Sequence, residues 1–224
     1  MNTDLNIFLD IETAATTRED IIARVTADVR PPANYKNADA IAKWWAENGE
    51  AQRVEAVSKT ALSGLWGSVI AIGYAVNDGE PHVITADTEA GVLTGFEMML
   101  SSEMHSIVSW EQRALWIGHN IEAFDLRYLW QRARITGADF TLRLPYQRYS
   151  SSQRYDTMLE WAGWGNRVKQ TDLELAFGLE RSDPLQHGGA DVHQALQEGR
   201  LEDVVAHCRE DIRLVREIYK RMRG

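Results

Sequence analysis

A strong strand signal runs from Ser68 to Val76, and a hairpin turn follows it directly. The Asn77-Asp78-Gly79 turn predicts a hairpin in which the partner strand lies at 82–86. Beyond the hairpin, helical and strand patterns alternate: a helix over 91–108, a short strand around Trp116, then another helix. An antiparallel hairpin followed by alternating helices and strands predicts a three-layer α/β domain with a mixed central sheet.

The two ends of the chain carry equally clear patterns. Residues Leu5 to Ile11 predict a first strand whose apolar side chains alternate between its faces. Apolar residues at three- and four-residue steps from Leu201 to Met222 predict a long C-terminal helix. A last strand is expected at 155–159 and a short helix at 171–177.

The stretch 13–65 is mostly polar and separates the first strand from the hairpin. Two prolines at 31 and 32 interrupt it, and a helix start is expected near Asp39. No flexible linker bounds this stretch, so we expect a helical insertion after the first strand, within a single domain that spans 1–224.

Composition limits the classes of protein that this chain can belong to. It has 33 acidic and 24 basic residues, a net charge of −9, which argues against a protein that coats nucleic acid but permits one local nucleic-acid site. Cys208 is the single cysteine, which excludes an internal disulfide and a thiolate metal cluster. The N-terminus has no secretion-signal pattern and no apolar run reaches 18 residues, so we expect a cytoplasmic protein without a membrane span.

Two acidic residues lie side by side at the end of the first strand. Asp10 and Glu12 are two positions apart, so their side chains leave the same face of the strand. Neighbouring carboxylates repel each other unless a cation lies between them. Because this pair ends an apolar strand that we expect to be central, a metal site and a purely structural role are equally good interpretations.

Asp125 follows the strand around Trp116 after a short loop, Gly118-His119-Asn120 and onward. Asn120 is predicted to cap the next helix, which places Asp125 in the first helical turn near the buried side. The alternative is that Asp125 serves only the helix dipole.

Asp211 lies on one continuous seam of the last helix with Val204, Cys208, Val215 and Ile218. A carboxylate at a core position is costly unless it is paired or binds a metal. We interpret Asp211 as a metal ligand, and the alternative is a buried ion pair with an arginine.

The four carboxylates Asp10, Glu12, Asp125 and Asp211 are hard oxygen donors, and no thiolate accompanies them. Such a set favours Mg²⁺ or Mn²⁺ over zinc or copper. Two divalent ions would carry about four positive charges, which matches four carboxylates. A two-ion site is suited to phosphodiester hydrolysis, because one ion activates water and the other stabilises the leaving oxygen.

These residues resemble the three motifs of the DEDD superfamily of 3′–5′ exonucleases. The matching segments are Phe8-Leu9-Asp10-Ile11-Glu12-Thr13, Gly118-His119-Asn120 with Phe124-Asp125, and Asp211 on the last helix. The closer likeness, over 34–36, 68–74 and 199–203, is to stand-alone exonucleases related to the proofreading domain of family B DNA polymerases. The resemblance implies an RNase H-like fold and two ions held by Asp10, Glu12, Asp125 and Asp211.

The third motif departs from the family pattern at His207. One class of the family has a tyrosine four residues before the last aspartate, and another has a histidine five residues before it. Here a histidine stands four residues before Asp211, about one helical turn away, so the two share a face. We predict that His207 orients the attacking water or acts as its general base. The alternatives are a histidine on the helix surface and a weakened enzyme.

Two further polar residues are expected to support the ligands from behind, Asp156 and Asn120. Asp156 comes just after the predicted last strand. Its alternative role is that of a turn or cap residue, which we favour slightly.

Positive charge is concentrated between Arg127 and Lys169, where eight basic residues accompany three acidic ones. Arginines and tyrosines interleave there, a mixture that suits a single strand because arginines bind phosphates and bases stack on rings. The predicted contacts are Arg143, Arg148, Tyr149 and Arg154. The alternative is a solvated loop with partly buried tyrosines.

The sequence therefore predicts a metal-dependent 3′–5′ exonuclease that releases nucleoside monophosphates from the 3′ end of single-stranded DNA. The 3′ direction comes from the resemblance, whereas the spacing of the acids supports only two-ion phosphoester hydrolysis. One alternative is an exoribonuclease on the same fold, and another is a non-catalytic nucleic-acid-binding module.

Overall fold

The computed structural model describes residues 5–147, 151–185 and 189–224. Its sheet has five strands in the order β3-β2-β1-β4-β5. They are β1 (Leu5–Ala14), β2 (Ser68–Val76), β3 (His82–Ile84), β4 (Ala114–Gly118) and β5 (Arg154–Asp156). Strand β4 runs parallel to β1 and β5, while β3 runs antiparallel to β2, so the sheet is mixed as the sequence predicts.

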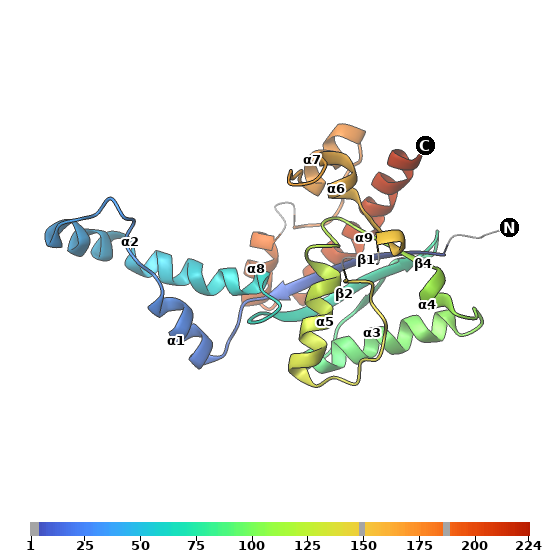
Figure 1. Ribbon diagram of the computed structural model, residues 1–224, viewed down its shortest axis with the longest axis horizontal. Coiled ribbons are helices and arrows are strands. Elements are labelled where there is room, and N and C mark those ends of the chain that lie inside the picture. Colours follow the sequence, from blue (N-terminus) through green and yellow to red (C-terminus); the bar gives the residue numbers. More distant parts are fainter. Residues whose placement is uncertain (1–4, 148–150, 186–188) are drawn as a thin grey trace. The chain divides into compact units, whose positions relative to one another are not determined.

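Helices cover both faces of the sheet, which makes a three-layer α/β domain (Figure 1). On one face, α3 (Glu89–Met104) and α5 (Asp125–Thr136) pack against alternate residues of β1, among them Ile7 and Leu9. On the other face, Phe8 of β1 packs against Ile212 of α9 (Leu201–Arg223). The period-two alternation of β1 therefore divides its side chains between two cores.

Smaller elements connect these layers. They are α4 (Trp110–Arg113), η2 (Ser151–Gln153), α6 (Thr157–Ala162), α7 (Gln170–Phe177) and α8 (Gly189–Gln197). Helices α6, α7 and α8 all contact α9. Among the described residues, no helix combines the length and the apolar character that crossing a bilayer requires.

Glycine at position 73 allows α9 to lie close against β2. A Cβ atom at Gly73 would stand 2.7 Å from the Cys208 sulfur and 3.0 Å from Ile212 Cγ1. Real Cβ atoms essentially never show a contact as short as 2.7 Å, and the Cys208 carbonyl oxygen would stand only 3.3 Å away, so a larger residue would require α9 or its side chains to shift. The position of α9 matters because this helix carries His207 and Asp211.

The predicted strand at 155–159 is wrong beyond Asp156. The Asp156 carboxylate accepts hydrogen bonds from the backbone N–H groups of Met158 (3.0 Å) and Leu159 (3.3 Å) and thereby caps α6. This cap begins a helix where the sequence suggests continued extension.

Residues Thr13–Ser68 form a compact unit of their own, close to the predicted insertion at 13–65. It contains α1 (Glu19–Ala27), α2 (Ala38–Ser58) and η1 (Lys59–Leu62). Asn37 caps α2 by accepting a hydrogen bond from Ala40 N at 2.7 Å. Within this unit, α1 packs against α2.

Candidate metal centre

Strand β1 carries Asp10 and Glu12 toward α9, because both side chains share the face of Phe8, which packs on that helix. Cys208 Sγ lies 3.9 Å from Asp10 Oδ2, and His207 Nε2 lies 4.0 Å from Glu12 Oε1. Glu12 is 8% exposed and Asp10 is half-buried. The last helix and the first strand thus meet at these two acids.

Asp125, the first residue of α5, lies next to the same pair. Its Oδ1 accepts a hydrogen bond from the backbone N–H of Ile11, the residue between Asp10 and Glu12, at 3.2 Å. Its side chain is buried, at 3% exposed. The loop before it differs from the prediction, because Phe124 and not Asn120 occupies the cap position of α5, and Asn120 adopts a left-handed backbone with φ of +63°.

Asp211 joins the cluster from α9, but it also contacts an arginine. Its Oδ1 accepts hydrogen bonds from Arg181 Nη2 (2.5 Å) and Gln170 Nε2 (3.1 Å), and its Oδ2 lies 3.3 Å from His207 Nε2. The ion pair that the sequence leaves open as an alternative is therefore present. It coexists with the approach of Asp211 to Glu12, since single ligand atoms of Glu12, His207 and Asp211 all lie within 4.8 Å of one another.

Arg181 contacts three acids, and sequence patterns missed all of these interactions except the possibility at Asp211. It makes two hydrogen bonds to Glu174, at 2.6 and 3.1 Å, and one to Asp183 at 2.9 Å. The next residue, Ser182, is fixed by Glu210, whose Oε1 accepts from the Ser182 N–H at 2.9 Å. Nothing in the local pattern sets Arg181 apart from the other basic residues of the chain, because Asp183 and Glu174 lie near it in a segment without periodicity and Asp211 is 30 residues away.

His207 is buried, at 4% exposed, so the alternative of a surface histidine is wrong. Its Nδ1 lies 2.8 Å from Asp183 Oδ1 and 3.3 Å from Arg181 Nη1. The shorter contact is to a carboxylate, which accepts, so we assign a proton to Nδ1, which donates a hydrogen bond to Asp183. Nε2 then faces Asp211 and Glu12.

Burial and mutual repulsion make the ionised form of the carboxylates in this cluster unfavourable. Burial, followed by repulsion from Asp211, raises the pKa of Asp10 and of Glu12 well above their ordinary values. Burial raises the pKa of Asp125 to about 7. Carboxylates that resist ionisation in this way gain most from a cation between them, so the donor set fits a divalent ion at Asp10 and Glu12.

The neighbouring thiol does not change this preference for hard ions. Ligand atoms of Asp10, Glu12 and Cys208 lie within 4.8 Å of one another. However, burial, and after it the negative charge of Asp10, raises the pKa of the Cys208 thiol well above its ordinary value. A thiol that stays protonated is a poor ligand, so the oxygen donors decide which ion fits.

Asp156 supports the loop before α5, and its hydrogen bonds go to backbone N–H groups of that loop and of α6. In addition to capping α6, it accepts from the N–H groups of Asn120 (2.9 Å) and Glu122 (3.1 Å). This is the turn-and-cap role that the sequence slightly favours. Its negative charge contributes to the raised pKa of Asp125.

The predicted nucleic-acid contacts have different outcomes. Arg154 is buried, and its guanidinium donates to the carbonyls of Pro145 (2.9 Å) and Gln147 (3.0 Å) and pairs with Glu122 (3.2 Å), so its expected role as a phosphate contact is wrong. Arg143 is exposed on the surface. Arg148 and Tyr149 lie outside the described residues.

Comparison with known proteins gives a structural likeness alone. No protein-family model matches the chain, and no curated protein matches it in sequence. A family B DNA polymerase from the hyperthermophilic archaeon Pyrobaculum calidifontis is similar in structure, with a TM-score of 0.58 and 15% identity. The match covers 97% of this chain and 24% of the polymerase, so the chain spans about a quarter of that protein's length. At this identity the likeness shows the fold, and the mixed sheet is consistent with the predicted RNase H-like architecture.

Proposed function

We propose that this protein is a metal-dependent nuclease that hydrolyses the terminal phosphodiester at the 3′ end of single-stranded DNA and releases nucleoside monophosphates. One observation carries the proposal: Asp10 and Glu12 of β1, Asp125 of α5 and Asp211 of α9 come together from distant parts of the chain. Divalent ions bound by these four acids, Mg²⁺ or Mn²⁺, would lower the pKa of the attacking water and stabilise the leaving oxygen. The structural likeness to a polymerase is consistent with this activity.

Within this proposal, His207 acts on the attacking water. Asp183 holds the proton on Nδ1 and fixes the orientation of the ring, which leaves Nε2 directed toward Glu12 and Asp211. Nε2 can accept the water's proton, and the nearby carboxylates stabilise the imidazolium that results. His207 therefore takes the place that a tyrosine or a differently spaced histidine has in the related exonucleases.

The ion pair between Arg181 and Asp211 supports a second candidate, a non-catalytic module that binds nucleic acid. A guanidinium on Asp211 occupies one of the oxygens that a second metal ion would need. The carboxylate cluster at Asp10 and Glu12 favours the enzyme, because burial and repulsion raise the pKa of both acids and such a pair has no evident structural benefit without a cation.

The test is degradation of 5′-labelled and 3′-labelled oligonucleotides, DNA and RNA, with Mg²⁺, with Mn²⁺ and with a chelator. We expect ladders that shorten from the 3′ end of DNA only with metal, and Asp10→Asn should slow turnover by at least about 10²-fold. Asp78→Asn, on the exposed β2–β3 turn, is the matched control and should behave as wild type.

Three other outcomes would replace this proposal. Faster shortening of RNA than of DNA would favour the exoribonuclease. Oligonucleotide binding with no shortening under any metal condition would favour the non-catalytic module. Equal activity of Asp10→Asn and wild type would exclude a metal-dependent reaction at this cluster.

A further inference from the structure

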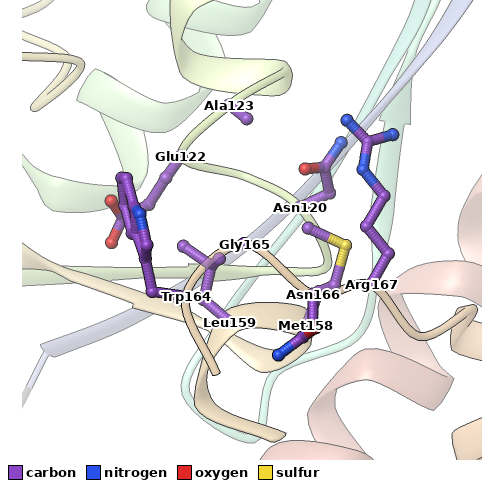
Figure 2. A pocket seen from close by; sticks show the side chains of 9 residues that line it. All are labelled: Asn120, Glu122, Ala123, Met158, Leu159, Trp164, Gly165, Asn166 and Arg167. Atoms are coloured by element: carbon purple, nitrogen blue, oxygen red, sulfur yellow. The ribbon is translucent and has the colours of Figure 1, made fainter. Parts of the chain in front are cut away.

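A cavity of about 390 Å³ lies beside the loop that connects α6 to α7. Its lining combines aromatic, apolar, amide and cationic side chains from three segments of the chain: Asn120, Met158, Leu159, Trp164, Asn166 and Arg167. Figure 2 shows Trp164 and Arg167 at opposite sides of the cavity, with Leu159 and Met158 between them. The volume lies in the range of pockets that hold small ligands.

The hydrogen bonds of this loop connect the cavity to the carboxylate cluster. His119, next to Asn120, contacts the carbonyl of Val168 through Nε2 at 3.0 Å. Two residues further on, Gln170 donates to Asp211 Oδ1 at 3.1 Å. The segment that follows the cavity's loop is thus hydrogen-bonded to Asp211, and Asn120 begins the turn that leads to Asp125, although the four acids do not themselves line the cavity.

The side chains around the cavity suit a nucleotide. Trp164 is 89% exposed, which is energetically unfavourable because its apolar indole ring is in contact with water. The ring is available for stacking on a base. Arg167 is exposed and adds a positive charge. Asn120 adds an amide side chain to the lining of the cavity. Glu122 pairs with Arg154, which reduces its repulsion of a phosphate.

We infer that this cavity binds one nucleotide of a single-stranded nucleic acid whose next phosphodiester lies at the carboxylate cluster. The base stacks on Trp164, and a backbone phosphate contacts Arg167. This inference rests on the proposed function, because it assumes that the cluster acts on nucleic acid. It replaces part of the binding surface that the sequence places around Arg143 and Arg154.

Two variants and two matched controls test the inference by binding alone. The probe is a fluorescently labelled dT hexanucleotide in chelator, which prevents metal-dependent cleavage, and affinity is measured by anisotropy at several salt concentrations. Trp164→Ala should weaken binding roughly 5- to 150-fold, the loss expected for one stacked base. Arg167→Gln should lower the slope of log affinity against log salt by about 0.7, one phosphate contact.

The controls separate a local effect from a general one. Trp161→Ala removes an exposed tryptophan that does not line the cavity, and Lys169→Gln removes an equal charge from the same loop. Both should stay within about twofold of wild type, and thermal melts should show that all four variants fold. Wild-type affinity in Trp164→Ala and an unchanged salt slope in Arg167→Gln would overturn the inference, as would equal losses in the controls or no binding by the wild type.

The outcomes also separate this inference from the proposed function. Binding that depends on Trp164 without any metal-dependent shortening would support the nucleotide site and refute the exonuclease. If the wild type shortens oligonucleotides while hexanucleotide affinity does not depend on Trp164 or Arg167, the exonuclease is supported and the nucleotide site is refuted.

Discussion

Replacing Arg181 by glutamine tests whether Asp211 serves an arginine or a metal ion. The guanidinium makes hydrogen bonds to Glu174, Asp183 and Asp211 at 2.5–3.1 Å, and its side chain is 11% exposed. Removing one partner from a buried ion pair costs about 3–5 kcal/mol, because the remaining charge stays buried without compensation. In chelator, we therefore expect Arg181→Gln to lower the free energy of unfolding by about that amount.

Divalent metal should recover part of this loss. Without the guanidinium, Asp211 Oδ1 becomes available to a cation, and the local positive charge that would repel the cation is gone. Binding that becomes tenfold tighter adds about 1.4 kcal/mol of stability at the same excess of metal. Urea unfolding with chelator and with Mn²⁺, together with calorimetric titration of Mn²⁺, measures both quantities.

Arg132→Gln is the matched control, because Arg132 forms a similarly buried ion pair with Glu89 away from the cluster, at 10% exposed. It should lose comparable stability with no metal-dependent recovery. Arg181→Lys keeps the charge and extends the test if the glutamine variant does not fold. Equal Mn²⁺ affinity in wild type, Arg181→Gln and Arg181→Lys would show that Asp211 is only an ion-pair partner.

Three further predictions concern single groups. His207→Ala should reduce turnover by roughly 10²–10⁴-fold while calorimetry still detects metal binding, and near wild-type turnover would exclude its role as a base. Because the pKa of Asp125 is about 7 in the folded protein and close to 3.8 in the unfolded chain, the folded state holds the extra proton between these values. In chelator, the contribution of Asp125 to the free energy of unfolding therefore decreases as pH rises from about 4 to 7. Asp125→Asn should flatten that part of the plot of unfolding free energy, measured in urea, against pH. Arg154→Met should lower the urea midpoint, with a loss of up to about 3–5 kcal/mol in the free energy of unfolding, and leave oligonucleotide affinity within about twofold of wild type. A loss of affinity without a loss of stability would show that Arg154 does contact nucleic acid.

The sheet and the acid pair could be predicted because short-range periodicity determines them. Alternation along β1 places Phe8 against α9, and Asp10 and Glu12 share that face. The seam of α9 places Asp211 on the buried side, together with Cys208. These predictions need no knowledge of which segments meet, since the two-residue period of a strand and the helical period each determine which side chains share a face.

The contacts of Arg181 and Arg154 could not be predicted because local periodicity does not determine them. Each arginine pairs with an acid distant in the sequence, Asp211 or Glu122, and also with groups a few residues away. Arg181 follows α7 in a segment without periodicity, and it meets Asp211, 30 positions later, only in the folded chain. Arg154 stands in an alternating run of arginines and tyrosines that suggests an exposed surface. Pairing of β5 with β4 instead directs its guanidinium to the carbonyls of the preceding segment.

The charge distribution around Arg181 indicates that its ion pair does not satisfy Asp211. One guanidinium carries a single positive charge, and Glu174 already binds it through two hydrogen bonds while Asp183 takes a third. If the pair neutralised Asp211, the pKa of this carboxyl would fall below its ordinary value. Burial instead raises the pKa of Asp211, although His207 and Arg181 both act to lower it. Burial therefore outweighs the two positive groups at Asp211, and a divalent cation would favour the ionised carboxylate further than the arginine does.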